Sequence, residues 1–426
     1  MKVYISTYGC ALNQSDSESI AGVLAKEGHD IVLSKDTADI VVINTCTVKG
    51  PTEAKIRKEL RELESQEKKV VLAGCLSQTK YGQKLYEKYS CVGTNTIDKI
   101  GAAVNAANER KVVSFIGEKH SQERISLPTI RTNNLIAIIP INEGCMSACS
   151  FCHTKKARGN TTSYSVEDIV ARVKNAVNNG AKEIWLTSPD TATWGKDIGK
   201  QLPELLRAVL MERGGFKVRL GMGNPDHLLE YIDELLEVMK NERMFKFLHV
   251  PVQSGSDAVL KKMLRPYSIA NFRTIVEKAR KAIPGITIAT DIIVGFPSET
   301  DEDFELTMRL LHDVQPEVLN MSRFWPRPDT LAAKMKQVPS NAVKERSIRL
   351  RNEFFAMAEK NNKKWIGLNG KVTVNETGKN GTFVGRTDSY RPVILASKVP
   401  LGSAIIVQVE NATPLDLRGK PAEANV

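Results

Sequence analysis

Three cysteines lie within eight residues of one another, in the run Cys145-Met-Ser-Ala-Cys149-Ser-Phe-Cys152. This C-x₃-C-x₂-C pattern, which we call the loop trio, directly follows an apolar, strand-like stretch. Three thiolates on one tight loop can hold three irons of a four-iron cluster, and the fourth iron then has no protein ligand. An open position on a bound metal is where a substrate binds.

The open iron of such a cluster suits S-adenosylmethionine (SAM). The amine and carboxylate of SAM can chelate that iron, and one electron from the reduced cluster can then cleave a carbon–sulfur bond. The resulting carbon radical can abstract hydrogen from an unactivated C–H bond. Three other interpretations stay open. Cys149-Ser-Phe-Cys152-His153 also matches the haem attachment motif C-x-x-C-H, Cys₃His matches a zinc site, and the cysteines can merely fill space, although three within eight residues on a polar loop do not resemble packing residues. The start of the chain, MKVYISTYGC, shows no secretory signal, which disfavours haem attachment.

A second set, which we call the sheet trio, consists of Cys10, Cys46 and Cys75. Each comes just past the end of a predicted parallel strand, in the sequences TYGC, INTC and LAGC. Because the carboxyl ends of parallel strands share one edge of a sheet, three thiols so placed can converge. Geometry alone leaves both a second metal site and three small buried packing residues open. The seventh cysteine, Cys91, matches no ligand pattern and is interpreted as structural, and an odd number argues against a disulfide framework.

Polar side chains at other predicted strand ends are candidates for holding SAM. Ser188 and Asp190 follow the second strand of the central region, Asn224 follows the third, Gln253 follows the fourth, and Asp291 lies in the fifth. Side chains at this end of a β/α barrel line the active site, so these five can bind the ribose hydroxyls and amino group of SAM. Each is equally compatible with capping a structural loop.

The elements that must position these groups follow from the apolar pattern. Over 1–115, β-branched apolar runs alternate with helical stretches, which predicts a doubly wound parallel α/β domain. Residues 116–134 are polar and irregular and are predicted to be a linker. Over 135–333, helical patterns alternate with six strand-like runs, which predicts a partial β/α barrel. The six runs are 135–142, 183–187, 217–222, 246–252, 286–294 and 318–324.

The last part of the chain is predicted to be a basic helical connector, 334–362, followed by a small antiparallel β-barrel, 363–426. From Lys334 to the end there are 16 Lys/Arg against 8 Asp/Glu, most of a total net charge of +11. This asymmetry indicates either a polyanionic partner or a merely basic, soluble surface. Lys371, Arg386 and Arg391 are the candidates for contacting RNA phosphates. No apolar run approaches ~18 residues, so no membrane span and a cytoplasmic location are expected.

The cysteine run and its surroundings resemble the radical SAM methylthiotransferase family. The quoted spacing, an aromatic Phe151 before the last cysteine, and segments along nearly the whole chain carry the resemblance, including a C-terminal barrel similar to a TRAM domain. The segments are INEGCMSACSFCHTKKARGN, EIWLTSPDTATWGKD, RLGMGNP, HVPVQSGSD, ATDIIVGFPSETDEDF and FWPRPDTLAAKM. They look closest to the archaeal and eukaryotic tRNA N6-threonylcarbamoyladenosine methylthiotransferases. Pro189 and Ala192 stand where relatives often show Glu and Gly, and Asp329 stands where PRPGT is usual, which bears on individual SAM contacts.

The resemblance implies SAM and two [4Fe-4S] clusters, one on the loop trio and an auxiliary one on the sheet trio. It implies a SAM-derived radical that abstracts hydrogen from C2 of a modified adenosine at position 37, in the anticodon stem-loop of tRNA. Sulfur is then delivered at the sheet trio and methylated by another SAM. An electron donor and a sulfur source, which the sequence does not identify, are the other implied partners. Related enzymes act on isopentenyladenosine in tRNA or on a ribosomal-protein aspartate, and a non-catalytic RNA-binding protein with zinc is the alternative of another class.

Overall fold

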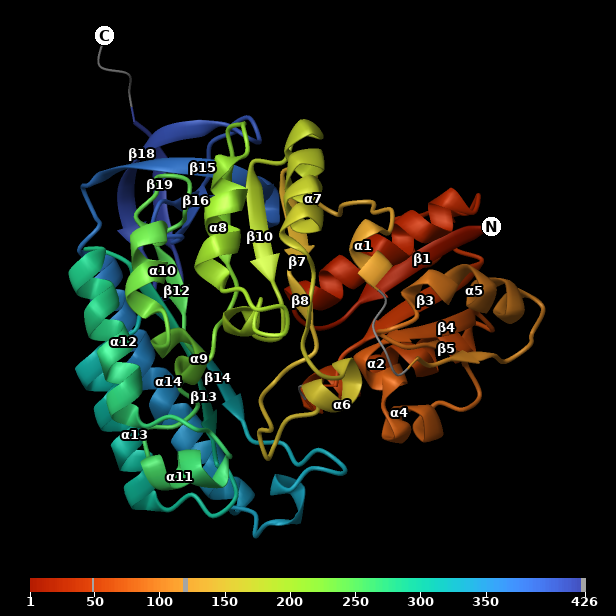
Figure 1. The fold of residues 1–426 in the computed structure, drawn as a ribbon, viewed down its shortest axis with the longest axis horizontal. Coiled ribbons are helices and arrows are strands. Elements are labelled where there is room, and N and C mark those ends of the chain that lie inside the picture. Colours follow the sequence, from red (N-terminus) through yellow and green to blue (C-terminus); the bar gives the residue numbers. More distant parts are fainter. Residues whose placement is uncertain (48–49, 118–121, 423–426) are drawn as a thin grey trace.

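The computed structural model describes residues 1–47, 50–117 and 122–422. The predicted linker and the predicted C-terminal barrel each include residues outside this part. The chain folds into an N-terminal parallel α/β part, a partial β/α barrel and a small closed β-barrel (Figure 1). The predicted fold class is therefore confirmed. Among the described residues, no helix combines the length and apolar character that crossing a bilayer requires.

The N-terminal part is a parallel sheet with the strand order β2-β1-β3-β4-β5-β6. Its third strand in the chain, β3 (Ile40–Thr45), is buried along its whole length because helices cover both faces, as a continuous β-branched run predicts. Helices α1 and α5 pack on one face and α2 packs on the other. The bounds are β1 (Lys2–Thr7), α1 (Ala11–Lys26), β2 (Asp30–Ile31), α2 (Gly50–Ser65), β4 (Lys69–Gly74), α3 (Cys75–Gln78), α4 (Lys80–Leu85), β5 (Ser90–Val92), α5 (Ile100–Asn108) and β6 (Ser114–Phe115).

The partial barrel consists of two parallel three-stranded ladders, β11-β10-β7 and β12-β13-β14. They meet where the Phe245 amide donates to the Val218 carbonyl at 2.9 Å. In the described part of the chain, β14 forms no ladder with β7, so the barrel stays open on that side. The strand bounds are β7 (Ile136–Pro140), β10 (Glu183–Thr187), β11 (Lys217–Leu220), β12 (Phe247–His249), β13 (Thr287–Val294) and β14 (Val318–Arg323).

Helices cover the outside of the partial barrel. Four of them begin at a Ser or Thr whose hydroxyl accepts a backbone N–H three residues on, namely Ser165, Ser256, Ser268 and Thr300. The other elements of this part are short and lie at the strand ends. The bounds are β8 (Asn142–Glu143), α6 (Thr154–Arg158), β9 (Thr162–Ser163), α7 (Val166–Asn178), α8 (Leu202–Met211), α9 (Pro225–Leu229), α10 (Ile232–Met239), α11 (Asp257–Lys262), α12 (Ile269–Ala282) and α13 (Asp301–Val314).

A long helix, α14 (Ser340–Lys363), leads into the closed barrel β15-β16-β17-β19-β18. Strands β17 and β19 pair in parallel, so the barrel is mixed, whereas the sequence predicts a purely antiparallel one. The reason is topological: an odd number of strands cannot close with every neighbouring pair antiparallel. The strand bounds are β15 (Asn369–Thr377), β16 (Phe383–Thr387), β17 (Pro392–Leu395), β18 (Ala404–Ala412) and β19 (Leu417–Pro421).

The C-terminal barrel covers the amino ends of the partial barrel's strands. The Lys246 amide donates to the Asp388 carbonyl at 2.7 Å, and Asn375 Nδ2 donates to Glu183 Oε2 at 2.7 Å. Strand β10 runs away from this barrel, toward α6 and the N-terminal part (Figure 1). The carboxyl ends of the strands therefore lie at the opposite end of the partial barrel, where the candidate site residues are.

Candidate functional site

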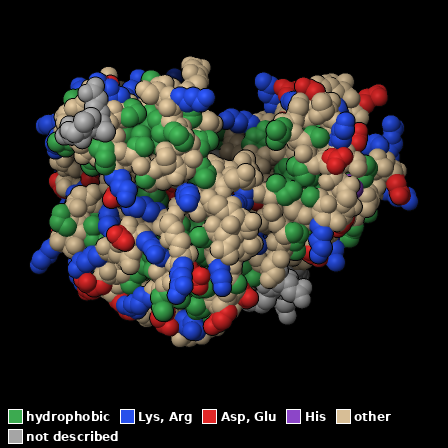
Figure 2. Space-filling model, turned by 90° about the horizontal axis from the view of Figure 1, so that it is seen from above, with side chains coloured by type: hydrophobic (Ala, Val, Ile, Leu, Met, Phe, Trp, Pro, Cys, Tyr) green, Lys and Arg blue, Asp and Glu red, His purple; other side chains and the backbone are tan. Residues whose placement is uncertain are grey.

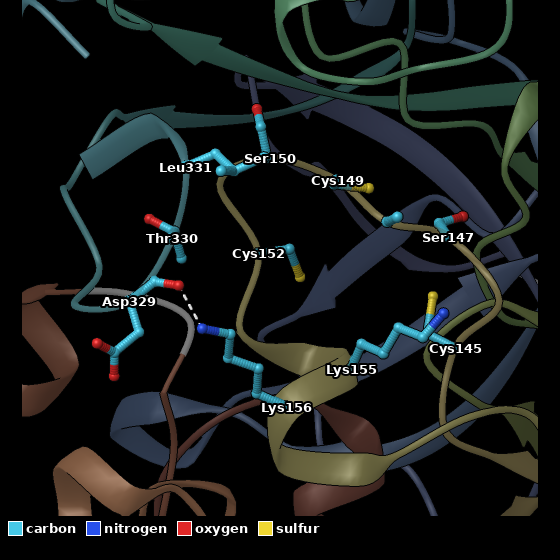
Figure 3. A pocket seen from close by; sticks show the side chains of 11 residues that line it. Cys145, Ser147, Cys149, Ser150, Cys152, Lys155, Lys156, Asp329, Thr330 and Leu331 are labelled. Atoms are coloured by element: carbon cyan, nitrogen blue, oxygen red, sulfur yellow. Dashed lines mark hydrogen bonds between the residues drawn. The ribbon is translucent and has the colours of Figure 1, made fainter. Parts of the chain in front are cut away.

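The loop trio lies between β8 and α6, beyond the carboxyl end of β7. Its cysteines are folded against their surroundings by backbone hydrogen bonds, from Cys145 N to Gly159 O at 3.1 Å and from Cys152 N to Cys149 O at 3.2 Å. The three side chains border one cavity of about 270 Å³, which Lys155, Lys156 and residues 329–331 also line (Figure 3). The structure thus places three thiols and two cations around one space.

Burial is the largest influence on the pKa values of two of these thiols, and it raises both. It raises the pKa of Cys145 to about 12 and the pKa of Cys149 to about 11, although the Arg265 guanidinium acts in the opposite direction on Cys149. Nucleophilic cysteines have lowered pKa values, and a thiol that binds a metal releases its proton to the solvent when the sulfur binds. These two thiols therefore lack the lowered pKa of an activated cysteine nucleophile.

The sheet trio gathers at the carboxyl edge of the N-terminal sheet. Cys10 immediately precedes α1, Cys46 follows β3, and Cys75 is the first residue of α3. Asn13 Oδ1 accepts the thiol of Cys10 at 3.7 Å and the thiol of Cys75 at 3.5 Å. A Cβ added to Gly9, whose φ of +120° suits only glycine, would lie 3.1 Å from the Cys46 Cβ. The chain therefore brings three cysteines that are far apart in sequence into one group.

The two cysteine loops lie side by side. Thr47 directly follows Cys46, and His153 directly follows Cys152; the Thr47 Oγ1 and His153 Nδ1 atoms are 3.1 Å apart. Helix α3, which begins at Cys75, packs against α6. Both trios therefore face the boundary between the N-terminal part and the partial barrel.

Four buried charges cross this boundary, and none of them was singled out from the sequence. Arg158 Nη1 donates to Glu143 Oε2 at 2.9 Å, and Arg158 also pairs with Asp16. Arg124 pairs with the same two carboxylates, and the side chains of all four residues are at most 7% exposed. Arg158 Nη2 also donates to Asn13 Oδ1 at 3.2 Å. The network therefore connects α6 to the oxygen that accepts two thiols of the sheet trio.

The residues predicted to hold SAM fall into two groups, and the first surrounds Asp190. Its Oδ1 accepts the backbone N–H groups of Ala192 and Asn224, both at 3.1 Å, and its Oδ2 accepts Asn224 Nδ2 at 2.6 Å. Ser188 Oγ accepts the Asp190 amide at 3.1 Å. Burial raises the pKa of the Asp190 carboxyl, and these hydrogen bonds oppose that effect. Asp190 therefore fixes the loop after β10 to the loop after β11.

Arg265, another residue that the sequence interpretation missed, joins this group to the loop trio. Its Nη1 donates to Asn224 Oδ1 at 2.7 Å, and its guanidinium lies 5.7 Å from the Phe151 ring centroid. Asn224 Nδ2 also donates to Ser147 Oγ at 3.3 Å. Arg265 Nε is buried and has no hydrogen-bond partner among the described residues. A free donor of this kind beside the thiols suits an anionic group such as the carboxylate of SAM.

The second group lies deeper in the partial barrel. Gln253 has a φ of +70°, and its amide donates to the Asp291 carbonyl at 2.8 Å. The Asp291 carboxylate accepts Asn320 Nδ2 at 2.8 Å and lies 2.9 Å from His249 Nε2. These side chains can hold a polar group inside the barrel, and their assignment to SAM stays a prediction.

Three positions depart from the related sequences, and their surroundings differ. Asp329 has a φ of +63°, a conformation that glycine adopts freely and that Asp tolerates better than most residues. Its carbonyl accepts the Lys156 ammonium (Figure 3). Ala192 is fully buried and Pro189 is half-buried. The chain thus keeps the backbone that a PRPGT glycine favours at the rim of the cysteine cavity.

The three candidates for RNA contact also separate. Lys371 is exposed on β15, whereas Arg386 and Arg391 are half-buried. Figure 2 shows Lys and Arg side chains interspersed with Asp and Glu on the face that it presents, rather than gathered in one patch. Lys371 is therefore accessible to a partner at the surface, whereas Arg386 binds Glu376 and Arg391 binds Asn362.

Either trio has to be weighed against a single-ion site. Within the described residues, no three His, Cys, Asp or Glu side chains are close enough to bind one metal ion together. In a four-iron cluster each thiolate binds a different iron, so the ligands do not meet at one point. Three thiolates are the donor set that a four-iron cluster with one open iron takes.

Comparisons with known proteins agree with this site. The pattern of the family described as "Radical SAM superfamily" matches residues 139–311, and that of "Uncharacterized protein family UPF0004" matches residues 2–94. A probable threonylcarbamoyladenosine tRNA methylthiotransferase of Pyrococcus horikoshii is 42% identical over 93% of each chain. The threonylcarbamoyladenosine tRNA methylthiotransferase of Homo sapiens is 39% identical over 99% of this chain and 74% of its own.

Solved structures show the same fold at low sequence identity. The radical SAM methyltransferase TsrM from Kitasatospora setae has a TM-score of 0.57 at 13% identity and covers 78% of this chain and 76% of its own. The chain therefore belongs to the radical SAM methylthiotransferases, in the branch of the archaeal and eukaryotic threonylcarbamoyladenosine tRNA methylthiotransferases.

Proposed function

We propose that this enzyme converts N6-threonylcarbamoyladenosine at position 37 of tRNA to its 2-methylthio derivative, with one four-iron cluster on each cysteine trio. The contact between Thr47 and His153, at 3.1 Å, is the observation that carries the proposal. Methylthio transfer removes a hydrogen from one carbon and delivers sulfur to the same carbon. The two metal sites must therefore face a single substrate atom, and adjacent cysteine loops meet this requirement.

When bound, the clusters would supply the electron that cleaves SAM, which gives the radical that removes the C2 hydrogen. They would also supply the sulfur that replaces this hydrogen. The protein's own residues bind and orient. Arg265 offers a guanidinium to the SAM carboxylate, and Asp190 holds Asn224 against Arg265 through the 2.6 Å and 2.7 Å hydrogen bonds. Arg158 and Asn13 fix the sheet trio relative to α6.

The substrate approaches from the side of the cysteine cavity. Lys155 and Lys156 line that cavity and provide positive charge for the phosphates of the anticodon stem-loop. Exposed Lys371 on the C-terminal barrel provides a second contact for the same RNA. An electron donor and a sulfur source complete the set of partners.

Three cysteine variants test the proposal, each prepared and reconstituted without oxygen. We expect Cys10→Ala to keep forming 5′-deoxyadenosine but to make no methylthio nucleoside, and Cys149→Ala to make neither product. Cys91→Ala is the matched control, because Cys91 packs in the core between strand and helix, and it should make both products. Iron and sulfide analysis and mass spectrometry of tRNA nucleosides give the readouts. Normal methylthiolation by Cys10→Ala would contradict the proposed role of the sheet trio, and conversion of isopentenyladenosine instead would contradict the substrate.

A further inference from the structure

A second cavity, of about 350 Å³, lies between the partial barrel and the C-terminal barrel. None of the residues that line it lines the cysteine cavity. Its walls come from β11 to β14, from α14 and from the segments 386–392 and 414–417 of the C-terminal barrel. It therefore lies toward the strand ends opposite to the loop trio, and the proposed reaction does not use it.

Three arginines line this cavity, and each has a free donor. The Nε atoms of Arg219, Arg386 and Arg391 are buried and have no hydrogen-bond partner among the described residues. Arg386 uses its Nη2 to bind Glu376 at 3.0 Å, and Arg391 uses its Nη1 to bind Asn362 at 2.5 Å. Buried donors are normally satisfied, and here three charged ones border the same space. Their shared location indicates that an acceptor belongs in the cavity.

Aromatic rings hold Arg219 in position. Its guanidinium lies 5.1 Å from the ring centroids of Trp185 and Phe247 and 5.2 Å from that of Tyr390. No salt bridge of Arg219 is found in the part of the chain that the structure describes. Ring faces attract a cation but leave its net charge in place. Arg219 therefore keeps a positive charge that an anion can neutralise.

The acidic residues at the cavity wall are engaged elsewhere. Glu317 accepts the Ile288 amide at 2.8 Å and pairs with Arg280 at 3.4 Å. Asp416 pairs with Arg418 at 3.2 Å. Glu376 compensates the charge of Arg386. Because Glu317 and Asp416 are paired with other cations, Arg219 and Arg391 give the cavity an excess of positive charge.

We propose that this cavity binds the phosphate group of a small phosphorylated molecule of about nucleotide size. Guanidinium groups match the oxygens of phosphate in both charge and geometry. The volume lies at the lower end of the range of about 300–1,000 Å³ found for small-molecule pockets. The aromatic and proline side chains in the wall suit the body of such a molecule. A cavity of this volume suits a free ligand better than a continuous RNA strand.

The position of the three arginines gives binding a structural consequence. Arg219 belongs to β11 of the partial barrel, whereas Arg386 and Arg391 belong to the C-terminal barrel. A phosphate that contacts all three connects the two parts, and a ligand that binds only the folded state raises the temperature of unfolding. The ligand would thereby fix the placement of the barrel that carries Lys371.

Isothermal titration of the full-length protein with uridine 5′-monophosphate and with inorganic phosphate tests this inference. We expect both to bind, uridine not to bind, and the nucleotide to raise the melting temperature. Arg219→Met and Arg391→Gln should each weaken nucleotide binding about tenfold or more, because each removes a charged hydrogen bond. Lys398→Gln is the control: it removes an exposed cation of the same part of the chain that lies outside the cavity lining, and it should bind like the parent.

Folding and RNA binding are separated by two further measurements. Arg391→Lys keeps the charge and loses the planar fork, so it should fold and still bind the nucleotide more weakly than the parent. An anticodon stem-loop RNA distinguishes the source of the phosphate. Any of three results would overturn the inference. The first is that neither phosphate probe binds, and the second is that the parent and Arg391→Gln bind the nucleotide equally. The third is that Arg219→Met and Arg391→Gln lose binding of the stem-loop RNA but not of the nucleotide.

Discussion

Arg158→Gln should be among the most damaging single substitutions outside the metal ligands. The substitution removes one of the two arginines that pair with Asp16 and Glu143 among the described residues, and the side chains of these two acids are 1% and 0% exposed. Breaking a buried ion pair on one side costs about 3–5 kcal/mol, because an uncompensated charge stays in a medium of low dielectric constant. That is a large part of the roughly 5–15 kcal/mol by which folded domains are stable.

Urea denaturation of the metal-free protein measures this loss. The network joins the N-terminal part to the partial barrel, so Arg158→Gln should lower the first transition and separate it from the unfolding of the rest. Arg349→Gln is the matched control. Its guanidinium also binds two carboxylates, Glu305 and Glu353, but it is 46% exposed, and its loss should cost less than about 1 kcal/mol. Equal shifts in the two variants would refute the assignment of the network as the connection between these parts.

A second readout separates a specific role from general destabilisation. Arg158 is a buried cation whose charge opposes the rise in the pKa of the Cys75 thiol that burial causes. It also donates a hydrogen bond to Asn13, whose side-chain oxygen accepts two thiols of the sheet trio. Removing the cation should make an auxiliary cluster harder to reduce and lower its midpoint potential, because reduction adds negative charge. The ratio of 5′-deoxyadenosine to methylthio product should rise in the folded fraction of Arg158→Gln, and Arg158→Lys should restore part of it. An unchanged potential and product ratio in folded Arg158→Gln would leave only a structural role.

Other substitutions test separate parts of the site. Burial raises the pKa of Glu18 to about 7, so the native state binds more protons than the unfolded state between about pH 4.5 and 7. The shift contributes about 3 kcal/mol to the free energy of unfolding. This contribution is present at low pH and is lost as the pH rises through 7. Glu18→Gln should flatten that dependence in urea titrations at several pH values. Asp190→Asn should weaken SAM binding about tenfold in isothermal titration at unchanged iron content. If the remaining oxygen keeps the two backbone N–H groups, the NH₂ that replaces Oδ2 cannot accept Asn224 Nδ2; unchanged affinity would contradict the positioning role. Trp325, which is 55% exposed and covers Gly50, should stack on a base of the stem-loop, so Trp325→Ala should cost about 1–3 kcal/mol of RNA binding in filter assays; equal affinities would show that the ring only covers Gly50.

The fold class could be predicted because the apolar runs and the helical stretches alternate in the first two parts. The run before Cys46 is β-branched throughout and becomes a strand buried along its whole length. One strand of the C-terminal barrel has no strand pattern in the sequence, because Leu417–Pro421 carries two cations and a glycine and has one fully buried apolar side chain, Leu417. Backbone hydrogen bonds to β17 and β18 position this strand. Such bonds require no apolar periodicity in the sequence.

The positioning residues could not be predicted from the sequence. Arg158 stands in the stretch KKARGN, which has the composition of an exposed basic turn, and its partner Asn13 is 145 residues away. Arg386 and Arg391 were predicted to contact RNA because they lie in a basic, aromatic-containing barrel. The structure places them half-buried at the base of the partial barrel, since the C-terminal barrel packs there. Packing between distant segments decided both cases, and local composition does not report it.

The charged network fixes the relative position of the two cysteine loops in a way that an apolar contact would not. Hydrophobic residues of similar volume often replace a buried ion pair without loss of stability, so stability alone does not account for four buried charges. Glu143 precedes Cys145 by two residues, Arg158 follows Cys152 by six, and Asp16 follows Cys10 by six, so three of the four charges lie close to a cysteine in the sequence. Ion pairs with fixed hydrogen-bond directions resist sliding, whereas apolar surfaces tolerate it. Because a misplacement of about 1 Å between reacting groups can cost about 10²-fold in rate, loosening this network should reduce sulfur transfer far more than SAM cleavage.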